Sequence, residues 1–128
     1  MSYHISRTIE VPLTEARQRT IDALSAAGFG VLTEIDVQAT MKKKLDRDMP
    51  GYVILGACNP EMAWQAMRHE PKIGTMLPCN VIVREVGEDK SEVSAVDPEA
   101  SMQSIENPML ADVARKVRDR LQGVIEAL

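Results

Sequence analysis

The segment Tyr52–Ala63 reads YVILGACNPEMA and contains the step from strand to helix on which the fold depends. Its first six residues form a short, continuously apolar run, which predicts a central strand buried on both faces. Asn59 and Pro60 then predict a helix start, because asparagine caps a helix and proline suits its first position. Cys58 therefore lies between a buried strand and the N-terminus of a helix that runs to about Glu70.

Upstream of that segment, the pattern alternates between strand and helix. Residues 3–11 alternate apolar and polar side chains, as in a half-buried strand, with Arg7 as the one misfit on the apolar face. An amphipathic helix follows and ends at Gly28, since glycine readily adopts the left-handed conformation that terminates helices. A second strand over 29–37 and a short helix capped by Asp36 complete this part of the chain.

Downstream of the segment, the pattern predicts a hairpin and a long helix. The stretches 79–87 and 91–97 are typical of strands, and the three residues Glu-Asp-Lys between them form the turn. Asn107 and Pro108 repeat the cap-plus-proline helix start. The apolar stripe of that helix comprises Leu110, Val113, Ala114, Val117, Leu121, Val124, Ile125 and Leu128. Such a helix spans about 30 Å, which is long enough to cover a sheet.

The order of these elements predicts a single α+β domain over residues 1–128. No internal repeat and no linker divides the chain. An antiparallel or mixed sheet of five strands, with the long helices packed on one face, is the most economical way to bury the apolar stripes.

Charge and composition narrow the classes of function. The 15 Lys and Arg against 19 Asp and Glu give a net charge of −4, which argues against nucleic-acid binding. No apolar run approaches the ~20 residues of a membrane span and no secretory signal is present, so we expect a cytoplasmic protein with reduced thiols. Signatures of NTP-binding, dinucleotide-binding and hydrolytic sites are absent, and we predict no cofactor.

The two cysteines are the main candidates for chemistry, and each precedes an asparagine: Cys58 with Asn59, and Cys79 with Asn80. The helix N-terminus beside Cys58 offers unpaired N–H groups and the positive end of a dipole, both of which favour a thiolate. If the two strands that carry the cysteines run antiparallel, both thiols lie at the same edge of the sheet. Three interpretations stand beside one another: buried structural thiols, a thiol or redox site, and a metal site.

Other polar clusters are weaker candidates. A metal site at the cysteines needs further ligands, and neither His4 nor His69 has ligand spacing to a cysteine. Glu34 and Asp36 share one face of a predicted strand, where paired carboxylates can do acid–base work but more often form a polar sheet face or a cap. The run MKKKLDRD at 41–48 could attract an anion, although its aspartates favour a solvated helix face.

Four segments together resemble one known family: FGVLTEIDVQATMKKKL, YVILGACNPEMA, GTMLPCNVIV and VSAVDPEASM. They are similar to the domain of unknown function 302 family of small bacterial and archaeal proteins, and the resemblance covers nearly the whole chain. The resemblance implies an α+β fold of β-α-β(4)-α type, similar to TBP-like domains, and a homodimer. It implies no catalytic residues.

Function hypotheses from different classes follow from these observations. The first is a homodimeric domain that binds a small, partly apolar ligand in a cleft between the sheet and the long helix, or at the dimer seam. The alternative is a thiol-based redox or metal-binding protein that uses Cys58 and Cys79, with Asn59 and Asn80 shaping the site. A third is a structural or interaction protein whose acidic surface meets a protein partner. No catalytic signature marks the chain as an enzyme.

Overall fold

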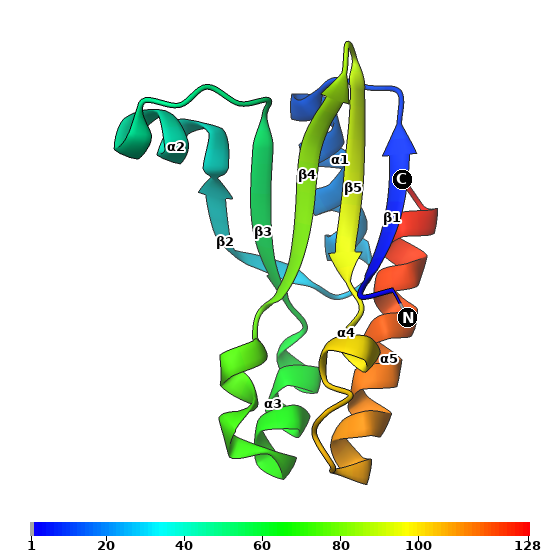
Figure 1. Cartoon of the computed structure of the whole chain (residues 1–128). Coiled ribbons are helices and arrows are strands. Elements are labelled where there is room, and N and C mark those ends of the chain that lie inside the picture. Colours follow the sequence, from blue (N-terminus) through cyan, green and yellow to red (C-terminus); the bar gives the residue numbers. More distant parts are fainter. Residues whose placement is uncertain (1) are drawn as a thin grey trace.

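The computed structural model describes residues 2–128, in which five strands form one sheet (Figure 1). The strands are β1 His4–Ile9, β2 Gly30–Asp36, β3 Tyr52–Cys58, β4 Cys79–Gly87 and β5 Lys90–Val96. The helices are α1 Leu13–Ala26, α2 Val37–Leu45, α3 Pro60–His69, the 3-10 helix η1 Pro71–Met76, α4 Pro98–Ser101 and α5 Pro108–Glu126. The spatial order is β1–β5–β4–β3–β2 and every neighbouring pair is antiparallel, which confirms the predicted α+β class.

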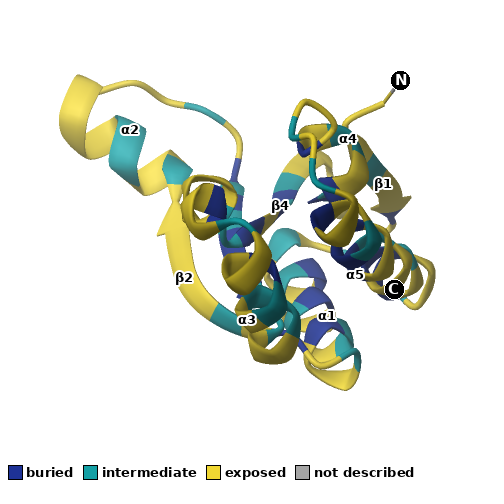
Figure 2. Ribbon diagram, turned by 90° about the horizontal axis from the view of Figure 1, so that it is seen from below, coloured by how far each residue is buried: buried dark blue, intermediate teal, exposed yellow. Residues whose placement is uncertain are grey.

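Helices α1 and α5 cover one face of the sheet, whereas none of residues 2–128 forms a layer over the other face, which we call the uncovered face (Figure 1). The buried side chains between these layers include Ala16, Leu24, Val53, Leu55, Val81, Val83, Val93, Ala95, Leu121 and Val124. Helices α3 and α4 lie beyond one end of the strands, beside the first half of α5, so that the core continues past the sheet edge (Figures 1 and 2). Within residues 2–128, no helix combines the length and the apolar character that crossing a membrane requires.

The predicted helix boundaries are confirmed by their caps. The side chain of Asn59 accepts the N–H of Met62 at 3.1 Å, and Asn107 accepts the N–H of Met109 at 3.1 Å. Asp36 accepts the N–H of Ala39 at 2.9 Å and so starts α2. Each side chain satisfies an N–H that has no partner within the helix. Gly28 follows α1 with a φ of +87°, the conformation for which glycine was expected there.

Arg7, the misfit on the apolar face of β1, has a specific partner. It pairs with Val93 in the sheet and therefore points to the helix-covered side. Its Nη1 donates to the carbonyl oxygen of Glu126 at 2.9 Å and to that of Ile125 at 3.4 Å. Because the last carbonyls of a helix lack partners within it and lie at the negative end of its dipole, Arg7 stabilises the C-terminus of α5.

The prediction for β3 was wrong in two respects. Strand β3 is second from the edge rather than central, and it is buried on one face only: Val53 and Leu55 are buried, whereas Tyr52 and Ile54 are half-buried. A continuous apolar run does not distinguish one covered face from two, because apolar side chains also occur on open sheet faces. The segment from Pro71 to Met76, after α3, forms the 3-10 helix η1. The likeness to TBP-like domains stays a prediction.

Gly56 packs too closely against its neighbours to accept a side chain. A Cβ at this position would collide with Oγ1 of Thr33 and lie 2.7 Å from Cγ of Pro78. The hydroxyl can rotate away, but the proline ring cannot. We expect Gly56→Ala to lower the free energy of unfolding by about 1–3 kcal/mol, the range for overpacked sites, measured by urea denaturation.

The matched control for that substitution is Gly74→Ala, because a Cβ at Gly74 meets nothing within 4 Å. The control should change the free energy of unfolding by less than about 0.5 kcal/mol, as surface substitutions usually do. Equal effects of the two substitutions would contradict the packing argument at Gly56.

Candidate functional site

A cavity of about 30 Å³ lies where the ends of β3 and β4 meet helices α3, α4 and α5. Its walls are mainly apolar and include Phe29, Met62, Met102, Leu110 and Val113. The polar side chains among the lining residues are two thiols and the amide of Asn59, and we name this space the thiol cavity. Its volume admits a water molecule or a group of a few heavy atoms, whereas pockets for drug-sized ligands measure about 300–1,000 Å³.

The sheet brings the two cysteines to this one cavity. Strands β3 and β4 pair antiparallel, with Ala57 opposite Cys79. The last residues of β3 and the first residues of β4 therefore lie at the same end of the sheet. Cys58 and Cys79 both line the thiol cavity, and both are free thiols. The antiparallel pairing of β3 and β4, which the prediction of a shared site required, is therefore present.

The two thiols differ in exposure. Cys79 is only 7% exposed, and burial raises the pKa of its thiol to about 11, with a smaller contribution from the negative charge that Cys58 can carry. Cys79 is therefore protonated at neutral pH. Cys58 is half-buried and directly precedes Asn59, the cap of α3. Of the two, Cys58 is the thiol that a reagent in solution can reach.

The structure separates the five candidate residues into two groups. Cys58, Asn59 and Cys79 line the thiol cavity. Asn80 does not: it is exposed and pairs with Gly56 across β3 and β4, one position beyond the buried Cys79. Because successive side chains of a strand alternate between faces, Asn80 points to the uncovered face of the sheet.

Glu34 lies outside the thiol cavity and has a structural partner. Both of its oxygens accept hydrogen bonds of 2.6 Å from Arg17 of α1, through Nε and Nη2. These bonds hold the pKa of Glu34 below its ordinary value, so the carboxylate stays ionised at neutral pH. Asp36, its neighbour on the same face, caps α2. The pair is thus occupied in holding β2 against α1 and in starting a helix.

The histidines and lysines have local partners as well. His4 lies on β1 with its Nδ1 2.6 Å from the hydroxyl of Ser6, and His69 is exposed at the end of α3. Lys42 pairs with Asp46 at 3.0 Å and with Asp48 at 3.1 Å. Across residues 2–128, no three side chains of His, Cys, Asp and Glu gather in a way that could hold a metal ion.

Sequence reasoning missed Met102, which closes one side of the thiol cavity from the end of α4. A signal for that helix was present: Asp97 and Pro98 repeat the cap-plus-proline start, and Asp97 accepts the N–H of Glu99 at 3.0 Å. The helix could have been predicted from this pair. The contact of Met102 with the cavity could not, because it depends on how α4 packs against α5.

The fold and the thiol cavity define a small α+β domain, and comparison with known proteins assigns its family. Residues 5–128 match the family described as "Domain of unknown function DUF302", and the chain belongs to that family. A solved structure, "Crystal structure of uncharacterized conserved protein DUF302 from Bacillus stearothermophilus", superposes with a TM-score of 0.91 at 23% identity. The match covers 99% of this chain and 98% of that chain and shows a shared fold. No curated protein matches the sequence.

Proposed function

We propose that the chain is a homodimeric binding domain that takes a small, largely apolar ligand in the thiol cavity. The observation that carries this proposal is the cavity itself: an apolar space at the junction of sheet and helices, with two thiols in its wall. Burial of a polar group without a partner costs free energy, so these walls favour apolar ligands over polar ones.

Two wall residues favour a cavity that adapts to its ligand. Met62 and Met102 line it from α3 and α4, and methionine has an unbranched side chain with several rotatable bonds. At about 30 Å³, the cavity suits a ligand of a few heavy atoms. Rotation of the methionines would extend that range to ring-sized molecules. A thiol can also contact a soft or sulfur-containing ligand directly.

Xenon and benzene test the ligand site when the methionine methyl groups are labelled with ¹³C for NMR. We expect saturable shifts of the Met62 and Met102 signals, since both side chains line the cavity. Met76 and Met109, which are exposed and do not line it, serve as internal controls. Uniform shifts of all methionine signals, or no saturable shift at all, would contradict the proposed ligand site.

The uncovered face of the sheet supports the homodimer. Ile35, Ile54 and Ile82 pair in register across β2, β3 and β4, and form an apolar row on this face. Ile35 is 47% exposed in a single chain. A twofold symmetric dimer buries the same patch of both copies, which suits such a row. Sedimentation equilibrium tests this part separately: a monomer at every concentration would contradict the homodimer and leave the ligand site untouched.

Thiol chemistry is the second candidate, favoured by the presence of both thiols on one cavity. In this reaction the Cys58 thiolate attacks a small disulfide such as oxidised glutathione, forming a mixed disulfide and releasing one glutathione thiolate. The Cys79 thiol then loses its proton and attacks Cys58 Sγ, forming the protein disulfide and releasing the second glutathione. The protein loses two hydrogens, and one glutathione disulfide becomes two thiols.

Mass spectrometry after treatment with oxidised glutathione distinguishes the outcomes of this second candidate. A loss of two hydrogens, reversed by a reductant and abolished in Cys79→Ser, would support a Cys58–Cys79 disulfide. A stable mixed disulfide at Cys58 alone would contradict it. The raised pKa of Cys79 disfavours the second step, which is why ligand binding is the first candidate.

A further inference from the structure

Helix α2 and the loop after it project from the edge of the sheet and have little support from the rest of the chain. We name residues 37–49 the arm. No residue of α2 is buried (Figure 2). Leu45, its last residue, is 61% exposed. A helix of nine residues is marginal by itself, because most helical stability in proteins comes from packing of an apolar face. Packing against another surface would supply the burial that the arm lacks within one chain.

The arm is basic. It contains Lys42, Lys43, Lys44 and Arg47 against Asp46 and Asp48, a net charge of +2. Both aspartates pair with Lys42, at 3.0 and 3.1 Å. Lys43, Lys44 and Arg47 form no ion pair with any of residues 2–128. The basic charge of the arm therefore faces solvent in a single chain.

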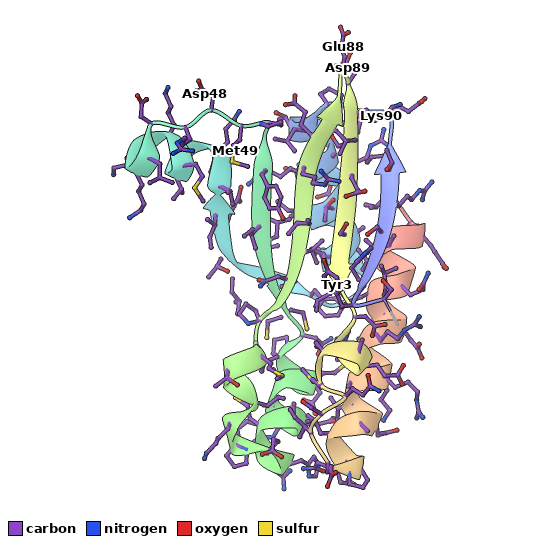
Figure 3. The ribbon with its side chains drawn as sticks, viewed as in Figure 1. Tyr3, Asp48, Met49, Glu88, Asp89 and Lys90 are labelled. Atoms are coloured by element: carbon purple, nitrogen blue, oxygen red, sulfur yellow. The ribbon has the colours of Figure 1, made fainter. Side chains whose placement is uncertain are left out.

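The turn between β4 and β5 has the opposite charge. We name residues 85–90 the hairpin tip; it contains Glu85, Glu88 and Asp89 against Lys90, a net charge of −2. Glu88 and Asp89 point away from the sheet (Figure 3), and Val86 beside them is 38% exposed. The hairpin tip thus combines acidic and apolar surface, as the arm combines basic and apolar surface.

The arm and the hairpin tip lie at the same end of the strands, opposite the thiol cavity (Figures 1 and 3). A twofold axis parallel to the strands keeps both features at that end in a second copy. If the axis passes beside β3, the arm beyond β2 of one copy meets the β4–β5 turn of the other. Such an axis also stacks the apolar row Ile35, Ile54 and Ile82 on the same row of the second copy.

We propose that the arm of each copy docks on the hairpin tip of a second copy of this chain, so that two reciprocal contacts hold the dimer together. Complementary net charges of +2 and −2 favour a second copy of this chain as the partner. One symmetry operation also satisfies both contacts and the apolar row at once. This contact rests on the proposed homodimer and assigns its interface.

Charge reversal tests the contact by sedimentation equilibrium at low salt. We expect Lys43→Glu with Lys44→Glu, or Glu88→Lys with Asp89→Lys, to raise the dimer dissociation constant at least about tenfold, since each change acts at both contacts. The quadruple variant, which exchanges the two signs, should have a dissociation constant within about threefold of wild type.

The matched control is Arg68→Glu with Lys72→Glu, an equal charge change on exposed residues at the opposite end of the strands. It should leave the dissociation constant within about threefold of wild type.

The outcomes separate this contact from the homodimer itself. A wild-type monomer at every concentration overturns both. A wild-type dimer whose dissociation constant is the same in all variants overturns the docking of the arm and leaves the homodimer. A quadruple variant as weak as either double variant also overturns the docking, because specific pairing predicts restoration.

Carbodiimide cross-linking of mixed ¹⁴N and ¹⁵N protein gives a direct measurement. We expect links from Lys43 or Lys44 to Glu88 or Asp89 that join a light and a heavy peptide. Links between these residues only within one isotope would overturn the contact, since they would place arm and tip together in the same chain.

Discussion

Iodoacetamide at pH 8 is expected to alkylate Cys58 at least about a hundredfold faster than Cys79 in the native protein. Only the thiolate reacts. With a pKa of about 11, Cys79 is ionised in about one molecule in a thousand at that pH, against about one in four for a model thiol of pKa about 8.5. Its low exposure slows the reaction further, whereas Cys58 is half-buried. Peptide mass spectrometry of timed samples measures both rates.

The pH dependence of that reaction has a defined sign. The rate at Cys79 should rise about tenfold for each unit of pH until it approaches pH 11, because the thiolate fraction rises in that proportion below the pKa. In denaturant the two cysteines should react at similar rates. Equal rates in the native protein, or a plateau for Cys79 below pH 9, would show that Cys79 is not buried as described.

Leu110→Ala is expected to lower the free energy of unfolding by about 3 kcal/mol and to enlarge the thiol cavity. Leu110 is 1% exposed and lines that cavity, and leucine-to-alanine substitutions in cores cost about 2–5 kcal/mol. The removed methyl and methine groups leave apolar space that benzene can occupy. Urea denaturation measures the loss of stability, and the ¹³C signals of Met62 and Met102 measure benzene binding. The affinity for benzene should rise at least about tenfold over wild type.

Leu121→Ala is the matched control for that substitution. Leu121 lies on the same helix and is fully buried, but it does not line the thiol cavity. A similar loss of stability is expected, without a change in the benzene response of Met62 and Met102. A gain in both variants would mean that any core defect admits benzene. That result would contradict the thiol cavity as a specific ligand site.

The positions of the helices could be predicted from local chemistry. Asn59 and Asn107, each followed by proline, start α3 and α5 where expected, because capping depends on residues within one turn of each other. The periodic stripe of α5 also identified its buried face, except that Leu128 lies beyond the helix and is half-buried. The structure buries Leu110, Val113, Ala114, Val117, Leu121, Val124 and Ile125. These predictions succeeded because the information is contained in neighbouring residues.

The surroundings of β3 were harder to predict. Its continuous apolar run predicts a strand covered on both faces, yet Tyr52 and Ile54 lie on the uncovered face. In the sequence, an apolar residue on the uncovered face cannot be distinguished from an apolar residue in the core. The apolar row Ile35, Ile54 and Ile82, which we propose to be buried in a dimer, therefore has the sequence pattern of core residues although it lies on the surface of a single chain.

The sequence by itself determined where α1, α2, α3 and α5 start and that Cys58 would precede one of them, since these starts depend on short-range hydrogen bonds and backbone preferences. It also determined that Cys58 and Cys79 would share an edge if their strands ran antiparallel. Only the tertiary structure decided that they do so, with Ala57 opposite Cys79. It also decided that Met102 closes the cavity and that the arm lies uncovered. These contacts join residues distant in the chain, and strand direction and packing depend on the free energy of the whole fold rather than on any one segment.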